Sequence, residues 1–204
     1  MKSNSNTMTL GIILTILGVG LTIVGIIFIT KNSDKVAESI EKIRQENEAI
    51  STEKQKGDDF EKFVIQKFSK SYFTIIEWTG DKYIDGMYPI SNTNPDLMLR
   101  FKMKEVEKDF AVECKYRSNY YKNGVEWCTG KQLENYQNFA TDREMPVFVA
   151  IGLGGVATAP EELFIIPLSE IKGVFLDKAF LERYKKENFK ESNLFFDYER
   201  GVLK

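Results

Sequence analysis

The stretch Asn94-Pro95-Asp96-Leu97-Met98-Leu99 decides the fold of this chain, together with Val112-Glu113-Cys114-Lys115 further along. Residues 96–103 and 109–115 are both rich in apolar and aromatic side chains, and a short polar segment separates them. Two such runs around a polar turn are typical of a β-hairpin. Proline cannot donate a ladder hydrogen bond, so its place just before the first run suits the start of a strand. The sequence therefore predicts a hairpin with an acidic residue at its entrance.

The charged residues of this hairpin are expected to converge at one end. A turn centred near residues 105–106 pairs Asp96 with Lys115. Because successive strand residues point to opposite faces, Glu113 and Lys115 share one face, while Cys114 points to the other, where an apolar core can cover it. Two carboxylates and an ammonium are the minimum set for holding Mg²⁺ beside a scissile phosphate.

The order of these motifs resembles that of the PD-(D/E)xK nuclease superfamily. Asp96 after a proline, followed by the Glu-x-Lys at residues 113–115, matches the pattern that names the family. Glu61, on a helix predicted over residues 58–70, matches the glutamate of the first helix. Gln132 and Tyr136 match a Gln-x-x-x-Tyr pattern on a later helix, predicted over residues 131–142, and residues four apart share one helical face. The resemblance covers roughly residues 57–170 and is one of motif order and spacing.

The resemblance implies a fold, a cofactor and a role for each site residue. The fold is α/β, with a restriction-endonuclease-like mixed sheet flanked by helices. Mg²⁺, for which Mn²⁺ can substitute, is expected on Asp96, Glu113 and the backbone carbonyl of Cys114, with Glu61 as a further candidate ligand. Lys115 is expected to position or help deprotonate the attacking water, while Gln132 and Tyr136 orient the phosphate. The implied activity is that of an endonuclease that hydrolyses phosphodiester bonds of DNA, in defence or DNA processing, and RNA stays open as an alternative substrate.

Other interpretations of the same residues stay open. Glu-x-Lys is a weak pattern, and the chain contains a second copy at residues 170–172, which lacks a preceding glutamate-bearing helix in the right order. One alternative is a catalytically inactive nuclease-fold module that serves as a membrane-tethered nucleic-acid-binding or scaffold protein. Another is a structural membrane protein whose hairpin charges face solvent.

Composition excludes several classes of site. The chain has 204 residues and no histidine, so it cannot form a Ser-His-Asp triad or a His-ligated zinc site. Cys114 and Cys128 are too few for a disulfide framework. The formal net charge is −2, so contact with nucleic acid must come from a local patch. Arg117, Lys122 and Lys131, interleaved with aromatic residues, are the candidates, and a solvated loop is the alternative.

Residues 10–30 form a second strong feature, because none of these 21 residues is charged. At 1.5 Å per residue, a helix of this length spans about 31 Å, close to the hydrocarbon thickness of a bilayer. The sequence predicts a short tail over residues 1–9, a single transmembrane helix over residues 10–30, and a cell-membrane protein. Basic residues are more frequent after the span than before it, so the carboxyl-terminal domain is expected in the cytoplasm.

The rest of the chain divides into a stalk and one domain. Residues 31–56 are highly charged and predict a helical stalk or a solvated linker, and a homodimer through span and stalk is a further expectation. Residues 57–204 are long enough for one nuclease-like domain with a single core. Its remaining expected elements are strands over residues 72–78, 146–151 and 163–167, a helix over residues 175–187, and aromatic residues at the carboxyl terminus that dock on the core.

Overall fold

The computed structural model describes residues 36, 38–45, 52–79 and 94–204. The predicted tail and membrane span lie outside these residues. Within the described ranges, no helix combines the length and apolar content needed to cross a bilayer. The chain divides into two compact units, Met1–Thr52 and Glu53–Lys204. The first contains an exposed helix over residues 38–45, which is part of the predicted stalk.

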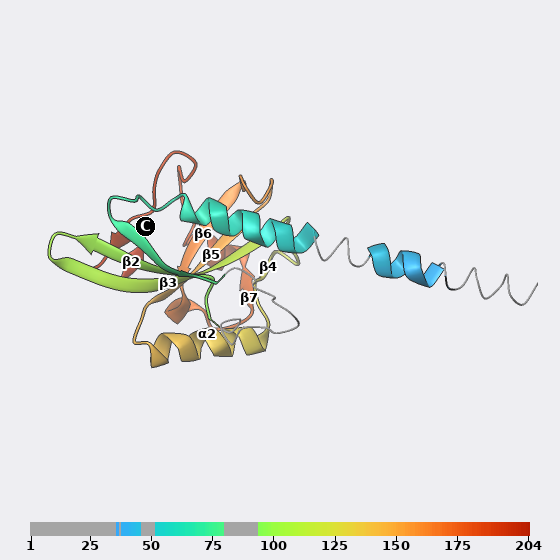
Figure 1. Ribbon diagram of the computed structural model, residues 1–204, viewed down its shortest axis with the longest axis horizontal. Helices are drawn as coiled ribbons and strands as arrows, with labels where there is room; N and C mark the ends of the chain where they lie inside the picture. Colours follow the sequence, from blue (N-terminus) through green and yellow to red (C-terminus); the bar gives the residue numbers. More distant parts are fainter. Residues whose placement is uncertain (1–35, 37, 46–51, 80–93) are drawn as a thin grey trace, which may run out of the picture. The chain divides into compact units, whose positions relative to one another are not determined.

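A five-stranded mixed sheet forms the centre of the second unit (Figure 1). Its spatial order is β1-β2-β3-β5-β6, made of β1 (Phe73–Trp78), β2 (Leu97–Met103), β3 (Val106–Arg117), β5 (Val147–Leu153) and β6 (Glu162–Pro167). β3 and β5 are parallel, and the other neighbours are antiparallel. The helix α2 (Gly130–Asp142) lies between β3 and β5 in the chain, as a parallel connection requires. The predicted α/β class with a mixed sheet is therefore confirmed.

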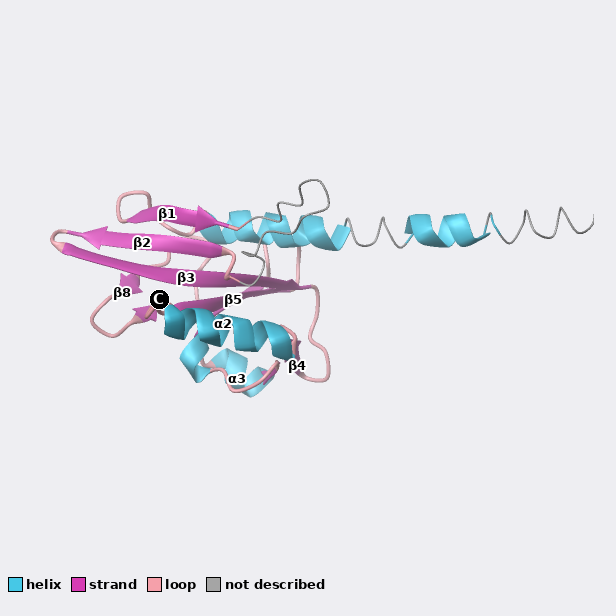
Figure 2. Ribbon diagram, turned by 60° about the horizontal axis from the view of Figure 1, so that its bottom comes forward, coloured by secondary structure: helices cyan, strands magenta, loops and turns pink. Residues whose placement is uncertain are grey.

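The sheet is covered on both faces (Figure 2). One face packs against the helix over residues 52–65, whose Phe60 and Val64 are fully buried. The other face packs against α2 through Tyr136 and Phe139. Because it is buried on both faces, β5 is apolar along its whole length (VFVAIGL) instead of alternating.

The predicted β2–β3 hairpin is confirmed, with a different register. Leu97 pairs with Val112 and Met103 pairs with Val106, so only Lys104 and Glu105 form the turn. The expected turn lay one residue later, and the pairing of Asp96 with Lys115 was wrong by two residues. A shift of two positions keeps every side chain on its predicted face, because strand residues alternate with a period of two.

The carboxyl-terminal third differs from the sequence expectation in one element. The helix predicted over residues 175–187 is wrong at both ends: Phe175–Asp177 forms β7 and pairs with β4 (Gly124–Glu126), and residues 183–187 are not helical. Only Lys178–Glu182 is helical, as α3. The final segment contains β8 (Phe196–Asp197) and β9 (Val202–Leu203), and Phe196 is buried in the core, as expected for a docked terminus.

Candidate active site

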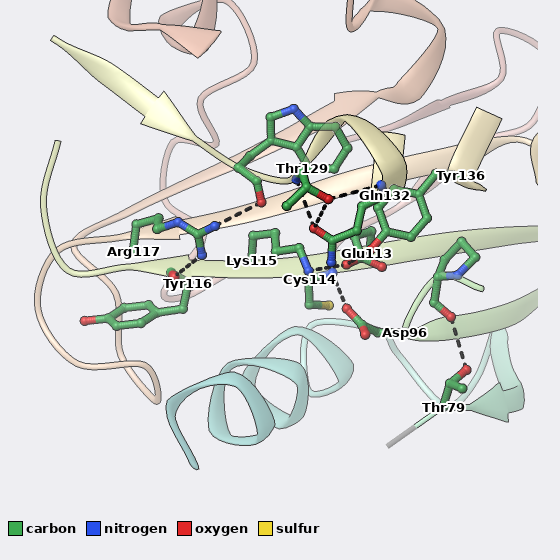
Figure 3. A network of polar contacts seen from close by, with 12 residues as sticks. Thr79, Asp96, Glu113, Cys114, Lys115, Tyr116, Arg117, Thr129, Gln132 and Tyr136 are labelled. Atoms are coloured by element: carbon green, nitrogen blue, oxygen red, sulfur yellow. Dashed lines mark hydrogen bonds and ion pairs between the residues drawn. The ribbon is translucent and has the colours of Figure 1, made fainter. Parts of the chain in front are cut away.

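Asp96 lies at the entrance to β2 and is fixed by hydrogen bonds on both sides. Its carboxylate Oδ2 accepts from the backbone N–H of Cys114 at 2.7 Å, which ties it to β3 (Figure 3). Its backbone carbonyl accepts from the N–H of Thr79 at 2.8 Å, and the Thr79 hydroxyl donates to the carbonyl of Pro95 at 3.1 Å. The end of β1 therefore holds the Pro-Asp segment in place.

Glu113 is the only polar or charged residue that is fully buried among those the structure describes, with 1% of its surface exposed. Its Oε1 accepts from the hydroxyl of Tyr136 at 2.6 Å and lies 2.5 Å from the ammonium Nζ of Lys115. Its Oε2 is buried and has no hydrogen-bond partner within the described part of the chain. An unsatisfied buried carboxylate oxygen is costly, so a polar ligand at that atom would be stabilising.

The electrostatics of the site follow from burying these groups together. Burial, and then the nearby charge of Glu113, raise the pKa of Asp96 well above its ordinary value, although Lys115 partly offsets this. Burial and Glu113 also raise the pKa of Tyr136, so its hydroxyl stays a donor. Burial alone would lower the pKa of Lys115, but the charges of Glu113 and Asp96 outweigh it, and the net pKa is raised. Lys115 is therefore a cation at neutral pH.

Glu61 reaches the site from the helix over residues 52–65. The preceding residue, Phe60, packs directly on Gly152 of β5, where a Cβ would lie 2.3 Å from the phenyl ring. That close approach holds the helix against the sheet. The Glu61 Oε2 accepts a hydrogen bond from the indole N–H of Trp78 at 2.7 Å. Burial raises the pKa of Glu61, the Trp78 bond partly offsets this, and the charge of Glu61 in turn contributes to the raised pKa of Asp96.

Helix α2 carries Gln132 in its first turn and Tyr136 at its middle, and Tyr136 lies beside β3. Thr129 caps this helix: its hydroxyl accepts from the Gln132 N–H at 3.3 Å, and the Gln132 Oε1 accepts from the Thr129 N–H at 3.0 Å. The side chain of Gln132 therefore serves the helix end, whereas Tyr136 meets the carboxylate of Glu113. The Trp127 ring stacks on Tyr136 with centroids 5.9 Å apart.

The three basic residues expected to contact nucleic acid lie in different surroundings. The guanidinium of Arg117 donates to the backbone carbonyls of Tyr116, Glu126 and Trp127 at 2.9 to 3.0 Å, so it fastens the loop before α2. Burial lowers its pKa from the ordinary value. Lys122 and Lys131 are exposed, and Lys131 lies 4.0 Å from Glu134 in an ion pair of two exposed side chains.

The donor set fits a hard divalent cation such as Mg²⁺. The described residues contain no group of three or more His, Cys, Asp or Glu side chains gathered as a metal site. What they contain is a pair of carboxylates, Asp96 and Glu113, joined through the backbone of Cys114, with one oxygen of Glu113 unsatisfied. Oxygen donors of this kind, completed by water, are those that Mg²⁺ prefers. Asp96, Glu113 and the Cys114 carbonyl are the residues that would hold it.

Two contributors to the site were not predicted. Trp78 contacts Glu61 through a side-chain bond across 17 positions of sequence, for which no periodicity gives a signal. The capping pair did have a signal, because Thr129 followed by Gln132 is the Thr-x-x-Gln form of a capping box.

Comparison with known proteins gives similarity at the level of the fold. No protein-family model and no curated protein sequence matches the chain. Among solved structures, the chain is similar to Hjc, a Holliday junction resolvase from the archaeal hyperthermophile Archaeoglobus fulgidus. The alignment has 16% identity and a TM-score of 0.45, and it covers 66% of this chain and 93% of that chain. This similarity concerns the path of the backbone, and the chemistry of the site rests on its own side chains.

Proposed function

We propose that this protein is a Mg²⁺-dependent endonuclease that hydrolyses phosphodiester bonds of DNA. The observation that carries the proposal is the buried Glu113, whose Oε2 has no partner among the described residues, set beside Asp96 and the ammonium of Lys115. A purely structural salt bridge would satisfy both oxygens of a buried carboxylate. A carboxylate with one oxygen left open is what a cation-binding site requires.

The side chains divide the chemistry between them. Bound Mg²⁺ would supply a Lewis acid that polarises the phosphodiester and acidifies a water molecule. Lys115 contacts Oε1 of Glu113 and leaves Oε2 open, so the ammonium can stay in place while the carboxylate binds a cation. From this position the ammonium of Lys115 orients the attacking water and offsets the charge that develops on the phosphate. Tyr136 remains protonated and holds Glu113 in position.

A second candidate function is supported by the same ion pair. The charges of Lys115 and Glu113 neutralise each other at 2.5 Å, and a module that has lost turnover could retain them for stability alone. This inactive module would bind nucleic acid or serve as a scaffold at the membrane. It predicts binding without cleavage in the experiment described next.

The test is a cleavage assay with the full-length protein purified in detergent. Supercoiled, linear and single-stranded DNA and RNA are incubated with Mg²⁺, Mn²⁺ or EDTA. We expect metal-dependent cleavage of DNA that falls at least about 100-fold in Lys115→Ala and Asp96→Ala. Lys172→Ala is the matched control, because Lys172 closes the second Glu-x-Lys and is exposed outside the site. Cleavage that persists in Asp96→Ala would contradict the proposal.

We also propose that residues 10–30 anchor the enzyme in the cell membrane with its domain in the cytoplasm. The support is the uncharged run of 21 residues and the basic residues that follow it. The full-length protein should sediment with membranes and resist extraction by high salt. A chain in which Gly18 and Val19 are both replaced by arginine should not, since charges at the centre of a span are costly. Release of the unaltered chain by salt would contradict the anchor.

A further inference from the structure

The segment between β3 and β4 ends in a tight turn that is strained. The N–H of Tyr121 donates to the carbonyl of Gly124 at 2.8 Å, and the N–H of Gly124 donates back at 3.0 Å, so Lys122 and Asn123 alone form the loop. Both have left-handed backbones, with φ of 46° and 60°. Two positive φ values are the pattern of a type I′ hairpin turn, where asparagine and glycine are common and lysine is not.

The base of this turn is fastened to the rest of the domain. The Asn123 carbonyl accepts from the N–H of Lys178 at 3.0 Å, and the Lys178 ammonium lies 5.1 Å from the centre of the Tyr120 ring. The Tyr120 hydroxyl donates to Glu162 at 2.9 Å. Gly124 packs so closely on β7 that a Cβ would lie 2.4 Å from the carbonyl oxygen of Leu176. These contacts fasten the turn to β7, to Lys178 and to Glu162.

An aromatic ring and a cation are exposed at this turn. Tyr121 is 55% exposed, more than any other aromatic side chain in the described ranges. The Lys122 ammonium lies 5.0 Å from the centre of its ring. An exposed cation–π contact is weaker than the stacking of a nucleobase on an aromatic ring, so a base can replace the lysine. The ammonium is then free to meet a phosphate.

Residues of the candidate active site lie close to the turn in sequence, both before it and after it. Tyr121 follows Lys115 by six residues, at most about 20 Å of extended chain. After the turn, β4 leads to Trp127, which stacks on the Tyr136 that binds Glu113. At 3.4 Å per nucleotide of a duplex strand, 20 Å corresponds to about six nucleotides.

We propose that this turn binds an unpaired nucleotide of the substrate within about six nucleotides of the cut, Tyr121 stacking on the base and Lys122 pairing with its phosphate. A base inside a regular duplex is already stacked on its neighbours, and only an unpaired one can offer its face. The inference rests on the proposed nuclease function and deepens it. The preferred substrate class is DNA with a single-stranded or branched segment next to the cleaved bond.

The test compares binding of paired and unpaired DNA by the full-length protein in the Lys115→Ala background, which keeps substrates intact. Fluorescence anisotropy is measured with Mg²⁺ on a duplex and on the same duplex with a three-nucleotide gap. We expect Tyr121→Ala to weaken binding to the gapped DNA about 5- to 150-fold and to leave duplex binding unchanged. Tyr121→Phe should retain binding, because the ring is kept. Tyr72→Ala, which removes another exposed tyrosine, is the matched control.

Salt dependence tests the role of the lysine separately. Lys122→Asn removes the charge and tolerates the left-handed backbone, and it should reduce the slope of log Kd against log salt by about 0.7 to 0.9. Equal weakening on duplex and gapped DNA, or none in Tyr121→Ala, would overturn the inference. In the cleavage assay, metal-dependent cutting that does not depend on Tyr121 would overturn the inference about the turn and would leave the nuclease proposal standing. Tyr121-dependent binding without cutting in the unmutated chain would support the turn and contradict the nuclease.

Discussion

Asp96 stores unfavourable electrostatic energy when no cation is present. Its carboxylate is buried near Glu113, and these two effects raise its pKa well above the ordinary value. The folded protein therefore binds a proton at Asp96 more tightly than the unfolded chain does. Stability from this group is complete at low pH and declines as the pH rises from about 3.8 towards the raised folded pKa.

Removing the charge of Asp96 should abolish this loss of stability at high pH. We expect Asp96→Asn to be more stable than the unmutated protein by about 1–3 kcal/mol at pH 8 in EDTA, because the amide keeps an acceptor for the Cys114 N–H and carries no charge. The difference should shrink as the pH falls. Urea unfolding at pH 5 and pH 8 measures it, and a variant no more stable than the parent at pH 8 would contradict this account.

We expect Trp78 to act as a positioning residue, through its hydrogen bond to Glu61. Trp78→Phe keeps the ring and removes the N–H that holds the Glu61 carboxylate. We expect the Mg²⁺ concentration for half-maximal cleavage to rise about 10-fold, which is the usual size for loss of an outer-shell partner. A double-mutant cycle with Glu61→Gln checks the route, because Trp78→Phe should add nothing once the carboxylate is gone. Fully additive effects would show that Trp78 acts elsewhere.

At the scale of elements, variants of the capping box of α2 test whether Gln132 serves only to cap the helix or also contacts the substrate. Thr129→Ala should lower the free energy of unfolding by about 0.5–2 kcal/mol, because the helix loses its N-cap. Gln132→Glu preserves the box, since glutamate is equally suited to that position. Thermal unfolding and cleavage are measured for both variants. If Gln132 serves only the helix, Gln132→Glu retains both stability and rate, and a selective loss of rate would assign it to the substrate.

The turn between β2 and β3 contains a strained residue. Lys104 has φ of 55°, and Glu105 does not have a positive φ. Lys104→Gly should therefore stabilise the protein by about 0.5 kcal/mol, because relief of the left-handed strain exceeds the entropic cost of glycine. Glu105→Gly is the control and should be neutral or destabilising. Chemical denaturation of the two variants is sufficient, and an equal effect of both would contradict the explanation.

The elements that could be predicted from the sequence are those whose apolar residues recur at a clear spacing. The alternation of apolar and polar residues predicted β2 and β3 and the faces to which Glu113 and Cys114 point. These faces are correct although the pairing register is not, because a shift of two residues leaves each side chain on the same face. The register itself depends on Lys104 at a left-handed position, which residue preference does not indicate. Phe175–Asp177 has only three residues, too few to show either period, and its pairing with β4 makes it a strand.

At the scale of the whole molecule, binding of a cation should raise the free energy of unfolding. A ligand that binds only the folded state at 100 times its Kd stabilises by about 2.7 kcal/mol. We expect Mg²⁺ to raise the Tm of the full-length protein, to leave Asp96→Ala unchanged, and to raise the Tm of Lys172→Ala as in the parent. Differential scanning fluorimetry measures the three. An equal rise in Asp96→Ala would indicate that the cation binds elsewhere.

Tertiary contacts account for what sequence reasoning missed in the site. The residue types and their order predicted Asp96, Glu113 and Lys115, and the structure brings them together. The bond from Trp78 to Glu61 requires the helix over residues 52–65 to lie at a particular depth on the sheet. That depth is set by Phe60 against Gly152. Such a contact depends on three separate segments, so no local pattern contains it.

The central position of β3 has a consequence for synthesis of the chain on the ribosome. β3 is bordered by β2, which is made earlier, and by β5, which is made later, and Glu113 is covered by Tyr136 from the helix between them. A nascent chain that has emerged only as far as β4 therefore exposes Glu113 to water and lacks one neighbour of the strand that carries it. If the chain is the nuclease proposed above, its site would be complete only when residues up to Leu153 have left the exit tunnel, and the emerging polypeptide would not cleave nucleic acid beside the site of translation.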